Sequence, residues 1–134
     1  MKETVNPTST AKTRDILVEV ESEYDLERSD PQNSYYFFVY HIKITNQGRQ
    51  TAQLLSRHWI ITDAEGNVEE VRGPGVVGEQ PVLKPGESFS YTSACPLKTP
   101  TGKMQGVYQM VLENGEKFDA EIASFELAPG YTLH

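Results

Sequence analysis

A glycine-rich run between residues 72 and 81 has the residue types and spacing that most strongly suggest chemistry in this chain. It reads Arg-Gly-Pro-Gly-Val-Val-Gly-Glu-Gln-Pro and satisfies Gly-x-Gly-x-x-Gly, the spacing that cradles a pyrophosphate in dinucleotide-binding proteins. That use needs a following helix, because the helix N-terminus supplies free N–H groups and a positive dipole. Here Pro81 and then Pro85-Gly86 follow within a few residues. We therefore expect an extended piece and a turn in place of the helix.

The sequence leaves two uses of this loop open. Its glycines and an arginine could hold a phosphate or a nucleotide in a nest of backbone N–H groups. Alternatively, a stiff loop whose two valines form an exposed apolar tip could bind a protein partner at a low entropic cost. The residues available for either use are Arg72, Gly73, Gly75, Val76, Val77, Gly78 and Gln80.

Other kinds of site find little support among the residues. The histidines are His41, His58 and His134, and their spacing is not that of metal ligands on one element. The single cysteine, Cys95, lies on an expected strand directly before a proline, where a small buried side chain is the usual role. Neither a nucleophile elbow nor a Walker loop occurs in the sequence. We therefore expect no catalytic residues, no metal site and no cofactor.

Length and charge narrow the class of protein. The chain has 134 residues and a formal net charge of −7, a length typical of one domain. An acidic surface argues against nucleic acid and anionic membranes as partners, because both bind through Lys and Arg. The sequence has neither an apolar run long enough for a membrane span nor the apolar core of a signal peptide. With one cysteine, we expect a cytoplasmic protein that does not insert into membranes.

Alternating apolar residues and frequent turn signals predict an all-β fold. The longest strand candidate covers residues 35–45, where the even-numbered residues are all apolar or aromatic. Further strand candidates begin near Ile16, Thr51, Val68, Phe89, Met104 and Phe118. About seven or eight short antiparallel strands of this kind are typical of an immunoglobulin-like or fibronectin type III-like β-sandwich.

The strand pattern also sets the expected boundaries. Residues 1–13 are polar and lack periodicity, so we expect a flexible N-terminal segment there. The sandwich domain is expected over residues 14–128, followed by a C-terminal tail over 129–134. Within the domain, Asn114-Gly115 predicts a type I′ hairpin turn. A change of apolar parity before Phe125 predicts a β-bulge.

Two further groups of residues could add to a binding surface. Trp59 is expected in the core, and Arg57 lies on the same side of its strand near a sheet edge. Arg57 could be satisfied structurally or could form an arginine–aromatic recognition patch beside the glycine loop. Tyr35 and Phe37 open the longest strand and could form a second apolar patch. Such a patch at an exposed sheet edge could also drive homo-oligomer formation.

Several blocks of the sequence occur in an order that is similar to a known family. They are residues 55–63 (LSRHWIITD), 73–81 (GPGVVGEQP), 83–93 (LKPGESFSYTS) and 99–110 (TPTGKMQGVYQM), preceded by Glu21–Tyr24 and Ser29–Pro31. Together they closely resemble the bacterial ApaG family over roughly residues 14–127. The resemblance implies a fibronectin-type or immunoglobulin-like sandwich, in agreement with the strand pattern.

The resemblance also shapes the functional expectation. The family carries a name linked to cobalt and magnesium efflux, and it brings no agreed catalytic residues. A related domain in eukaryotic F-box proteins and in a polymerase-delta-interacting protein resembles a protein-interaction module. We therefore expect a non-enzymatic module that binds an unknown protein partner, with any link to metal tolerance indirect. Phosphate or nucleotide binding through the Gly73–Gly78 loop is the alternative.

Overall fold

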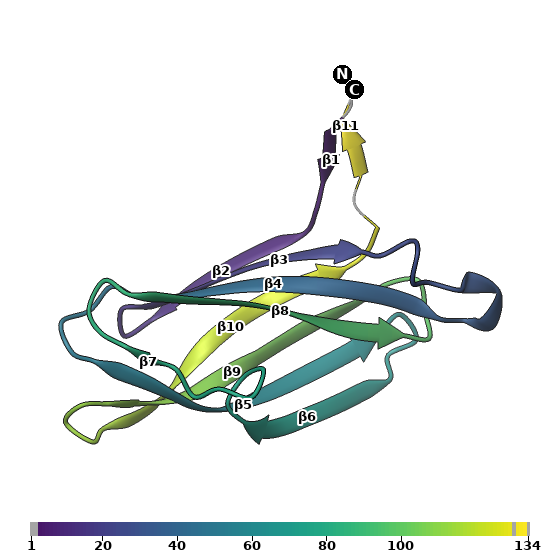
Figure 1. Ribbon diagram of the computed structural model, residues 1–134. Coiled ribbons are helices and arrows are strands. Elements are labelled where there is room, and N and C mark those ends of the chain that lie inside the picture. Colours follow the sequence, from purple (N-terminus) through teal and green to yellow (C-terminus); the bar gives the residue numbers. More distant parts are fainter. Residues whose placement is uncertain (1–2, 130, 134) are drawn as a thin grey trace.

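The structure, a computed structural model, describes residues 3–129 and 131–133 (Figure 1). The described residues form strands and one short 3-10 helix, η1 (Pro31–Asn33). The strands are β1 (Glu3–Val5), β2 (Thr8–Thr13), β3 (Ile16–Tyr24), β4 (Tyr36–Asn46), β5 (Ala52–Asp63), β6 (Val68–Pro74), β7 (Val82–Leu83), β8 (Ser88–Leu97), β9 (Gly102–Leu112), β10 (Lys117–Leu127) and β11 (Tyr131–Leu133). This part of the chain contains no helix with the length and apolarity that a membrane crossing needs.

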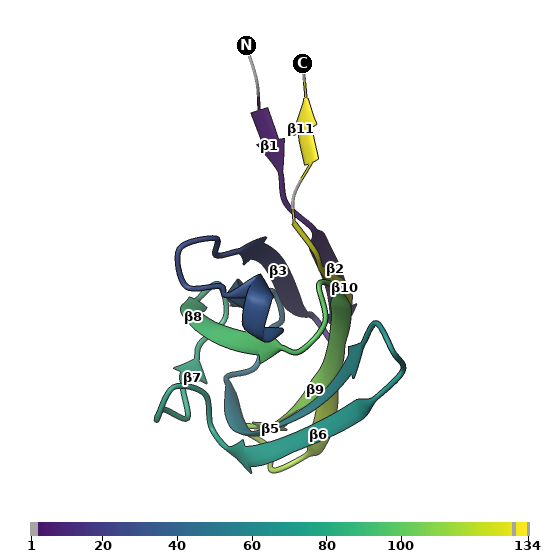
Figure 2. The same cartoon turned by 90° about the vertical axis from the view of Figure 1, so that its right-hand side faces the viewer.

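Two antiparallel sheets pack face to face as a β-sandwich (Figures 1 and 2). One sheet has four strands in the order β2-β3-β4-β8. The other has five, in the order β10-β9-β5-β6, with β7 pairing to the start of β5. The all-β sandwich predicted from the sequence is confirmed, although its two sheets hold more strands than the seven or eight expected.

The two sheets meet along one side of the sandwich, where β2 lies beside β10. The Ser9 hydroxyl donates a hydrogen bond to the Ala123 carbonyl at 2.9 Å, and the Glu121 N–H donates to the Thr13 hydroxyl at 3.0 Å. On the opposite side, β8 ends the four-stranded sheet and β6 ends the other. The sandwich therefore has one closed side and one open side.

An aromatic cluster fills the centre of the core. Trp59 packs against Tyr40, Phe125 and Tyr108, with ring centroids 5.5, 6.0 and 6.3 Å away. The Tyr91 and Tyr108 hydroxyls hydrogen-bond to each other inside the core. These side chains come from both sheets, so their packing holds the two layers together. Trp59 is buried, which confirms the prediction from the sequence.

The expectation of a flexible segment over residues 1–13 is wrong for most of that segment. Thr8–Thr13 forms β2, which pairs along its whole length with β3. The connecting turn is two residues long, and both Arg14 (φ 47°) and Asp15 (φ 65°) adopt the left-handed region. Asp15 is a common turn residue, but the long side chain of Arg14 is unusual in the left-handed region and no glycine follows, so the sequence did not signal the hairpin.

The chain ends also differ from the expected boundaries. Glu3–Val5 and Tyr131–Leu133 pair as an antiparallel ribbon that projects from the sandwich (Figures 1 and 2). Part of the expected tail over 129–134 is therefore a strand. Residues 1, 2, 130 and 134 of the two expected end segments lie outside the described residues.

The structure confirms the bulge and corrects the turn type in the last hairpin. The register of β10 against β9 shifts between Ile122 and Phe125, as the parity change predicts. At the hairpin, only Gly115 has a positive φ, and its N–H donates to the Leu112 carbonyl at 2.8 Å. The loop therefore has three residues ending in a left-handed glycine, instead of the predicted type I′ turn.

The buried hydroxyl and thiol groups predict a loss of stability in alkaline solution. Burial raises the pKa of Tyr40, Tyr91 and Tyr108 above the ordinary value, and it raises the pKa of Cys95 to about 12. In the unfolded chain these groups ionise near pH 10 and about pH 8.5, respectively. The folded state then keeps protons that the unfolded state releases, so the contribution of these four groups to stability is fully present below about pH 8 and is lost as the pH rises further.

This pH dependence can be measured by urea unfolding at about pH 8 and about pH 10.5. We expect a lower midpoint at the higher pH, and Cys95 should react with a thiol reagent only as fast as the protein opens. A midpoint that is equal at both pH values would contradict the burial of these groups.

Candidate functional site: the glycine hairpin

Residues 74–81, called the glycine hairpin here, connect β6 to β7. The Val76 N–H donates to the Glu79 carbonyl at 2.8 Å, and the Glu79 N–H donates to the Val76 carbonyl at 2.9 Å. The two residues between them, Val77 (φ 43°) and Gly78 (φ 81°), both lie in the left-handed region. This is the geometry of a two-residue type I′ turn, so the segment closes on itself as a tight hairpin.

Gly75 fixes how the chain enters the hairpin. Its φ is 61°, and a Cβ built on it would lie 2.2 Å from the Glu79 carbonyl oxygen. Its N–H donates to the Leu55 carbonyl at 2.9 Å. Only glycine combines that backbone angle with so close an approach. The second glycine of the Gly-x-Gly-x-x-Gly spacing is thus explained by packing within the hairpin.

Arg57 clamps the hairpin from the neighbouring strand. One guanidinium nitrogen donates to the carbonyls of Pro74 at 3.0 Å and Gly75 at 2.9 Å. The guanidinium lies over Gly73, where a Cβ would meet it at 3.0–3.2 Å. The first glycine therefore makes room for Arg57, and the positive charge of Arg57 is directed at backbone oxygens. Of the two roles left open by the sequence, the structure places Arg57 in the structural one.

Two further contacts hold the far end of the hairpin. The Gln80 side-chain amide donates to the Leu55 carbonyl at 2.8 Å. The Gln53 side-chain amide donates to the Gln80 carbonyl at 3.2 Å. Because β5 receives hydrogen bonds from both ends of the hairpin, the turn at its tip has little freedom to rearrange.

The two valines of the hairpin have opposite environments. Val76 is 1% exposed and belongs to the hydrophobic core, whereas Val77 is 55% exposed. The prediction that Val76 forms part of an exposed tip is wrong. In a type I′ turn, the residue before the turn can anchor to the protein while the first turn residue points to solvent. The apolar tip is therefore Val77 alone.

Val77 is under backbone strain. A β-branched residue with positive φ is a conformational outlier, because the branched side chain crowds the backbone in the left-handed region. Such outliers cost on the order of 1–3 kcal/mol and persist where the surrounding structure enforces them. An exposed, strained valine is therefore a feature that folding stability alone does not favour.

Replacing Val77 by asparagine should stabilise the protein. Asn-Gly is the preferred pair for a type I′ turn, because asparagine tolerates the left-handed region. We expect Val77→Asn to raise the free energy of unfolding by about 1 kcal/mol, measured by urea titration. A lower unfolding free energy in Val77→Asn would show that the Val77 side chain contributes packing that outweighs its strain.

The hairpin is poorly suited to cradle a phosphate. The N–H groups of Gly75, Val76 and Glu79 already donate to protein carbonyls. The chain continues into β7, so the helix N-terminus of a dinucleotide site does not follow. Arg72 belongs to β6, its side chain is 73% exposed, and its guanidinium lies 3.7 Å from the Glu70 carboxylate. The Gly75, Val76 and Glu79 N–H groups are therefore not available to an anion unless these contacts break.

The second predicted patch lies at the start of β4, in the four-stranded sheet (Figure 1), whereas the hairpin extends from β6 in the other sheet. The rings of Tyr35 and Phe37 are 6.2 Å apart, and the Arg28 guanidinium lies over Phe37 at 5.5 Å. Leu26, which the sequence did not single out, lies near Arg28 in the loop between β3 and β4 and is 74% exposed. The structure therefore does not bring Arg57 together with Tyr35 and Phe37 in one patch.

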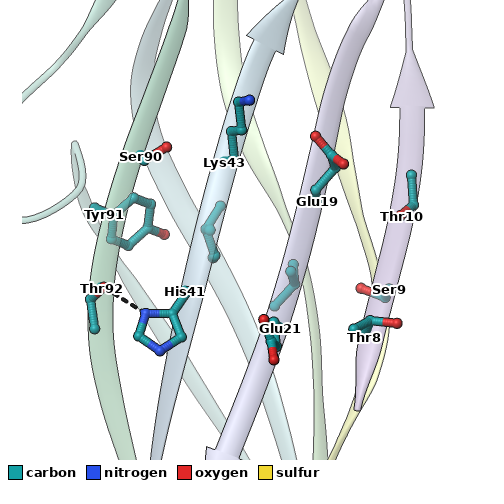
Figure 3. Close-up of a pocket in the computed structure, with 12 residues that line it drawn as sticks. Thr8, Ser9, Thr10, Glu19, Glu21, His41, Lys43, Ser90, Tyr91 and Thr92 are labelled. Carbon is teal, nitrogen blue, oxygen red and sulfur yellow. Dashed lines mark hydrogen bonds between the residues drawn. The ribbon is translucent and has the colours of Figure 1, made fainter. Parts of the chain in front are cut away.

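The outer face of the four-stranded sheet forms a shallow concavity of about 550 Å³ (Figure 3). Polar side chains from all four strands line it, and Glu21 and Lys43 belong to strands β3 and β4 at its centre. His41 hydrogen-bonds through Nδ1 to the Thr92 hydroxyl at 2.8 Å. The sequence did not indicate this concavity, because the β2 edge was not recognised as a strand.

The acidic and histidine side chains do not converge on a metal site. Within residues 3–129 and 131–133, no three His, Cys, Asp or Glu side chains are placed to hold an ion together. His58 contacts the Glu70 carboxylate at 2.8 Å and His41 lies 3.5 Å from the Glu23 carboxylate, on different sheets. Cys95 is buried.

The fold and the hairpin define a class of protein: a two-sheet β-sandwich that carries a clamped glycine hairpin at the end of β6. Residues 26–112 match the ApaG domain family. The chain is 55% identical over 123 residues to Protein ApaG of Bordetella pertussis, covering 92% of this chain and 94% of that protein. It is 57% identical to Protein ApaG of Beijerinckia indica over 115 residues, covering 86% and 88%. The chain belongs to the ApaG family.

Solved structures agree with this assignment. A crystal structure of a Bordetella pertussis protein described as ApaA matches with a TM-score of 0.85 and 55% identity, covering 88% of this chain and 96% of that one. A second X-ray structure, of a structural genomics target, matches with a TM-score of 0.82 and 48% identity, covering 89% and 90%. The similarity thus extends over nearly the whole sandwich.

Proposed function

We propose that this protein is a non-enzymatic binding module that contacts a protein partner through the tip of the glycine hairpin. The observation that carries the proposal is Val77, an apolar side chain that is exposed to solvent and held in a strained conformation. Strained residues that persist at a surface are concentrated at binding and active sites. A partner that covers Val77 would repay the strain by burying its apolar surface.

The contacts around the tip support the same function. Arg57 and Gln80 fix the hairpin before any partner arrives, so little conformational entropy remains to be lost on binding. Glu79 at the turn and Arg72 on the preceding strand β6 are both exposed and would add polar groups around an apolar centre. That arrangement is common in protein–protein interfaces.

The alternative functions have less support. A phosphate or nucleotide would have to compete for the N–H groups of Gly75, Val76 and Glu79, which already donate to protein carbonyls. The association of the family name with cobalt and magnesium then reflects an indirect effect, exerted through the partner.

A photo-crosslinking amino acid placed at residue 77 would test the proposal. It should capture one protein from the native host, and the same probe at Ser124, an exposed position on β10, should not. In parallel, titration with pyrophosphate, ATP and diadenosine polyphosphates by NMR should leave the Gly73, Gly75 and Gly78 signals unchanged. Localised shifts of these signals at sub-millimolar ligand would instead establish the nucleotide-binding alternative.

A further inference from the structure

The edge of β8 differs from the other three edges of the sandwich. The edges of β2 and β10 lie against each other and exchange hydrogen bonds at the closed side. The edge strand β6 is exposed, carries Glu69, Glu70 and Arg72, and ends at Pro74. Charged side chains and proline are the devices by which edge strands avoid pairing with other chains. Three of the four edges are therefore covered or protected.

β8 lacks these protections over most of its length. From Ser88 to Cys95 it contains no charged residue, glycine or proline. Among the described residues it has a backbone partner on one side only, the strand β4. Alternate N–H and C=O groups of an antiparallel edge strand point away from its sheet and are free to pair. Pro96, which has no N–H, ends the stretch that could pair.

We propose that two copies of this protein associate by antiparallel pairing of their β8 strands around a two-fold axis. The two four-stranded sheets then form one continuous eight-stranded sheet across the dimer. The β8 edge and the glycine hairpin belong to different sheets of the sandwich.

The residues of β8 suit pairing with themselves. A two-fold axis beside Tyr91 places Ser90 opposite Thr92 of the partner subunit, and Ser88 opposite Ala94 of the partner subunit. Ser90, Thr92 and Ala94 are exposed and small, so a second strand can approach closely. Hydroxyl pairs across strands are favourable, whereas like charges in facing positions would oppose a self-pairing strand. A second copy is favoured over a charged peptide, because this edge offers no charge to recognise one.

The charge of the rest of the protein predicts how the dimer responds to salt. Each copy carries a formal net charge of −7, so two copies repel each other over a distance. Added salt screens that repulsion, and the pairing of uncharged strands is itself little affected. Dimerisation should therefore strengthen as the salt concentration rises, whereas binding of a basic partner would weaken.

Sedimentation velocity of the full chain tests the proposal, at protein concentrations up to on the order of 1 mM and at about 0.05 and 0.5 M salt. We expect a monomer–dimer equilibrium that tightens at the higher salt. Ser90→Lys, which adds a charge to the exposed side of β8, should weaken the dimer at least about tenfold. The matched change Ser124→Lys on β10, and Val77→Asp in the glycine hairpin, should leave it unchanged.

A protein that stays monomeric under all these conditions would overturn the proposal, and so would a dimer that Ser90→Lys does not affect. If Ser90→Lys lowers the melting temperature, its effect on the dimer could come from unfolding. Amide hydrogen exchange of the unmodified protein then tests whether β8 pairs with a second copy. The β8 amides that do not donate to β4 should then become protected as the concentration rises. Protection that does not depend on concentration would refute β8 pairing.

Discussion

Replacing Gly75 by alanine is expected to destabilise the protein by about 3 kcal/mol. The added Cβ would lie 2.2 Å from the Glu79 carbonyl oxygen, and the residue would keep a φ of 61° that alanine adopts only under strain. The hairpin must open to relieve that contact, and Val76 would then leave the core. Urea unfolding of Gly75→Ala against the unmodified protein measures the effect.

Gly78→Ala is the matched control for this substitution. Gly78 also has a positive φ, of 81°, but a Cβ there would meet no atom within 4 Å. Alanine at residue 78 should therefore cost only the backbone strain, about 1 kcal/mol. If Gly75→Ala and Gly78→Ala are equally destabilising, the close approach of Glu79 to Gly75 does not exist in solution.

Replacing Arg57 by methionine is expected to destabilise the protein by about 2 kcal/mol. Methionine keeps much of the apolar length of the side chain but leaves the Pro74 and Gly75 carbonyls without their shared donor. The Gly75 carbonyl is partly buried, so water can replace the donor only in part. The unfolding free energy from urea titration gives the size of the effect.

Arg72→Met controls for the loss of a positive charge from the same region. Arg72 faces His58 in the pairing of β5 with β6, adjacent to the pair formed by Arg57 and Gly73. Its side chain is exposed, and its distance to the Glu70 carboxylate, 3.7 Å, is typical of a weak surface pair. We expect Arg72→Met to change stability by less than about 0.5 kcal/mol. A larger effect from Arg72→Met than from Arg57→Met would contradict the clamp.

The sandwich could be predicted because its strands have one buried face. Residues such as Phe38, Tyr40 and Ile42 are buried and alternate with partly buried or exposed ones, and this period identifies a strand without knowledge of its neighbours. The strand β2 was not predicted, because Thr8–Thr13 is polar and its residues are only half buried at most. Its position depends on long-range contacts with β3 and β10, which the local sequence does not reveal.

The glycine hairpin could be located from the sequence but not described. The spacing of its glycines indicated a special backbone, and Gly75 and Gly78 do have positive φ. The sequence could not show which valine is exposed, because this depends on where the turn begins. Moving the turn by one residue along the chain would exchange the buried and exposed valines. The clamp by Arg57 was not predictable either, since it also depends on a register shift between Leu54 and Ser56 in β5. Such a bulge changes which side chains reach the edge of a strand.

We claim that Val77 is retained for binding at a cost in stability, and the variant Val77→Asn separates these two effects. Isothermal titration calorimetry would compare the captured partner's affinity for the unmodified protein, Val77→Asn and the conservative variant Val77→Ile. The claim predicts that Val77→Asn unfolds at a higher urea concentration yet binds about tenfold or more weakly, while Val77→Ile binds normally. A Val77→Asn variant that binds the partner as tightly as the unmodified protein would contradict the claim.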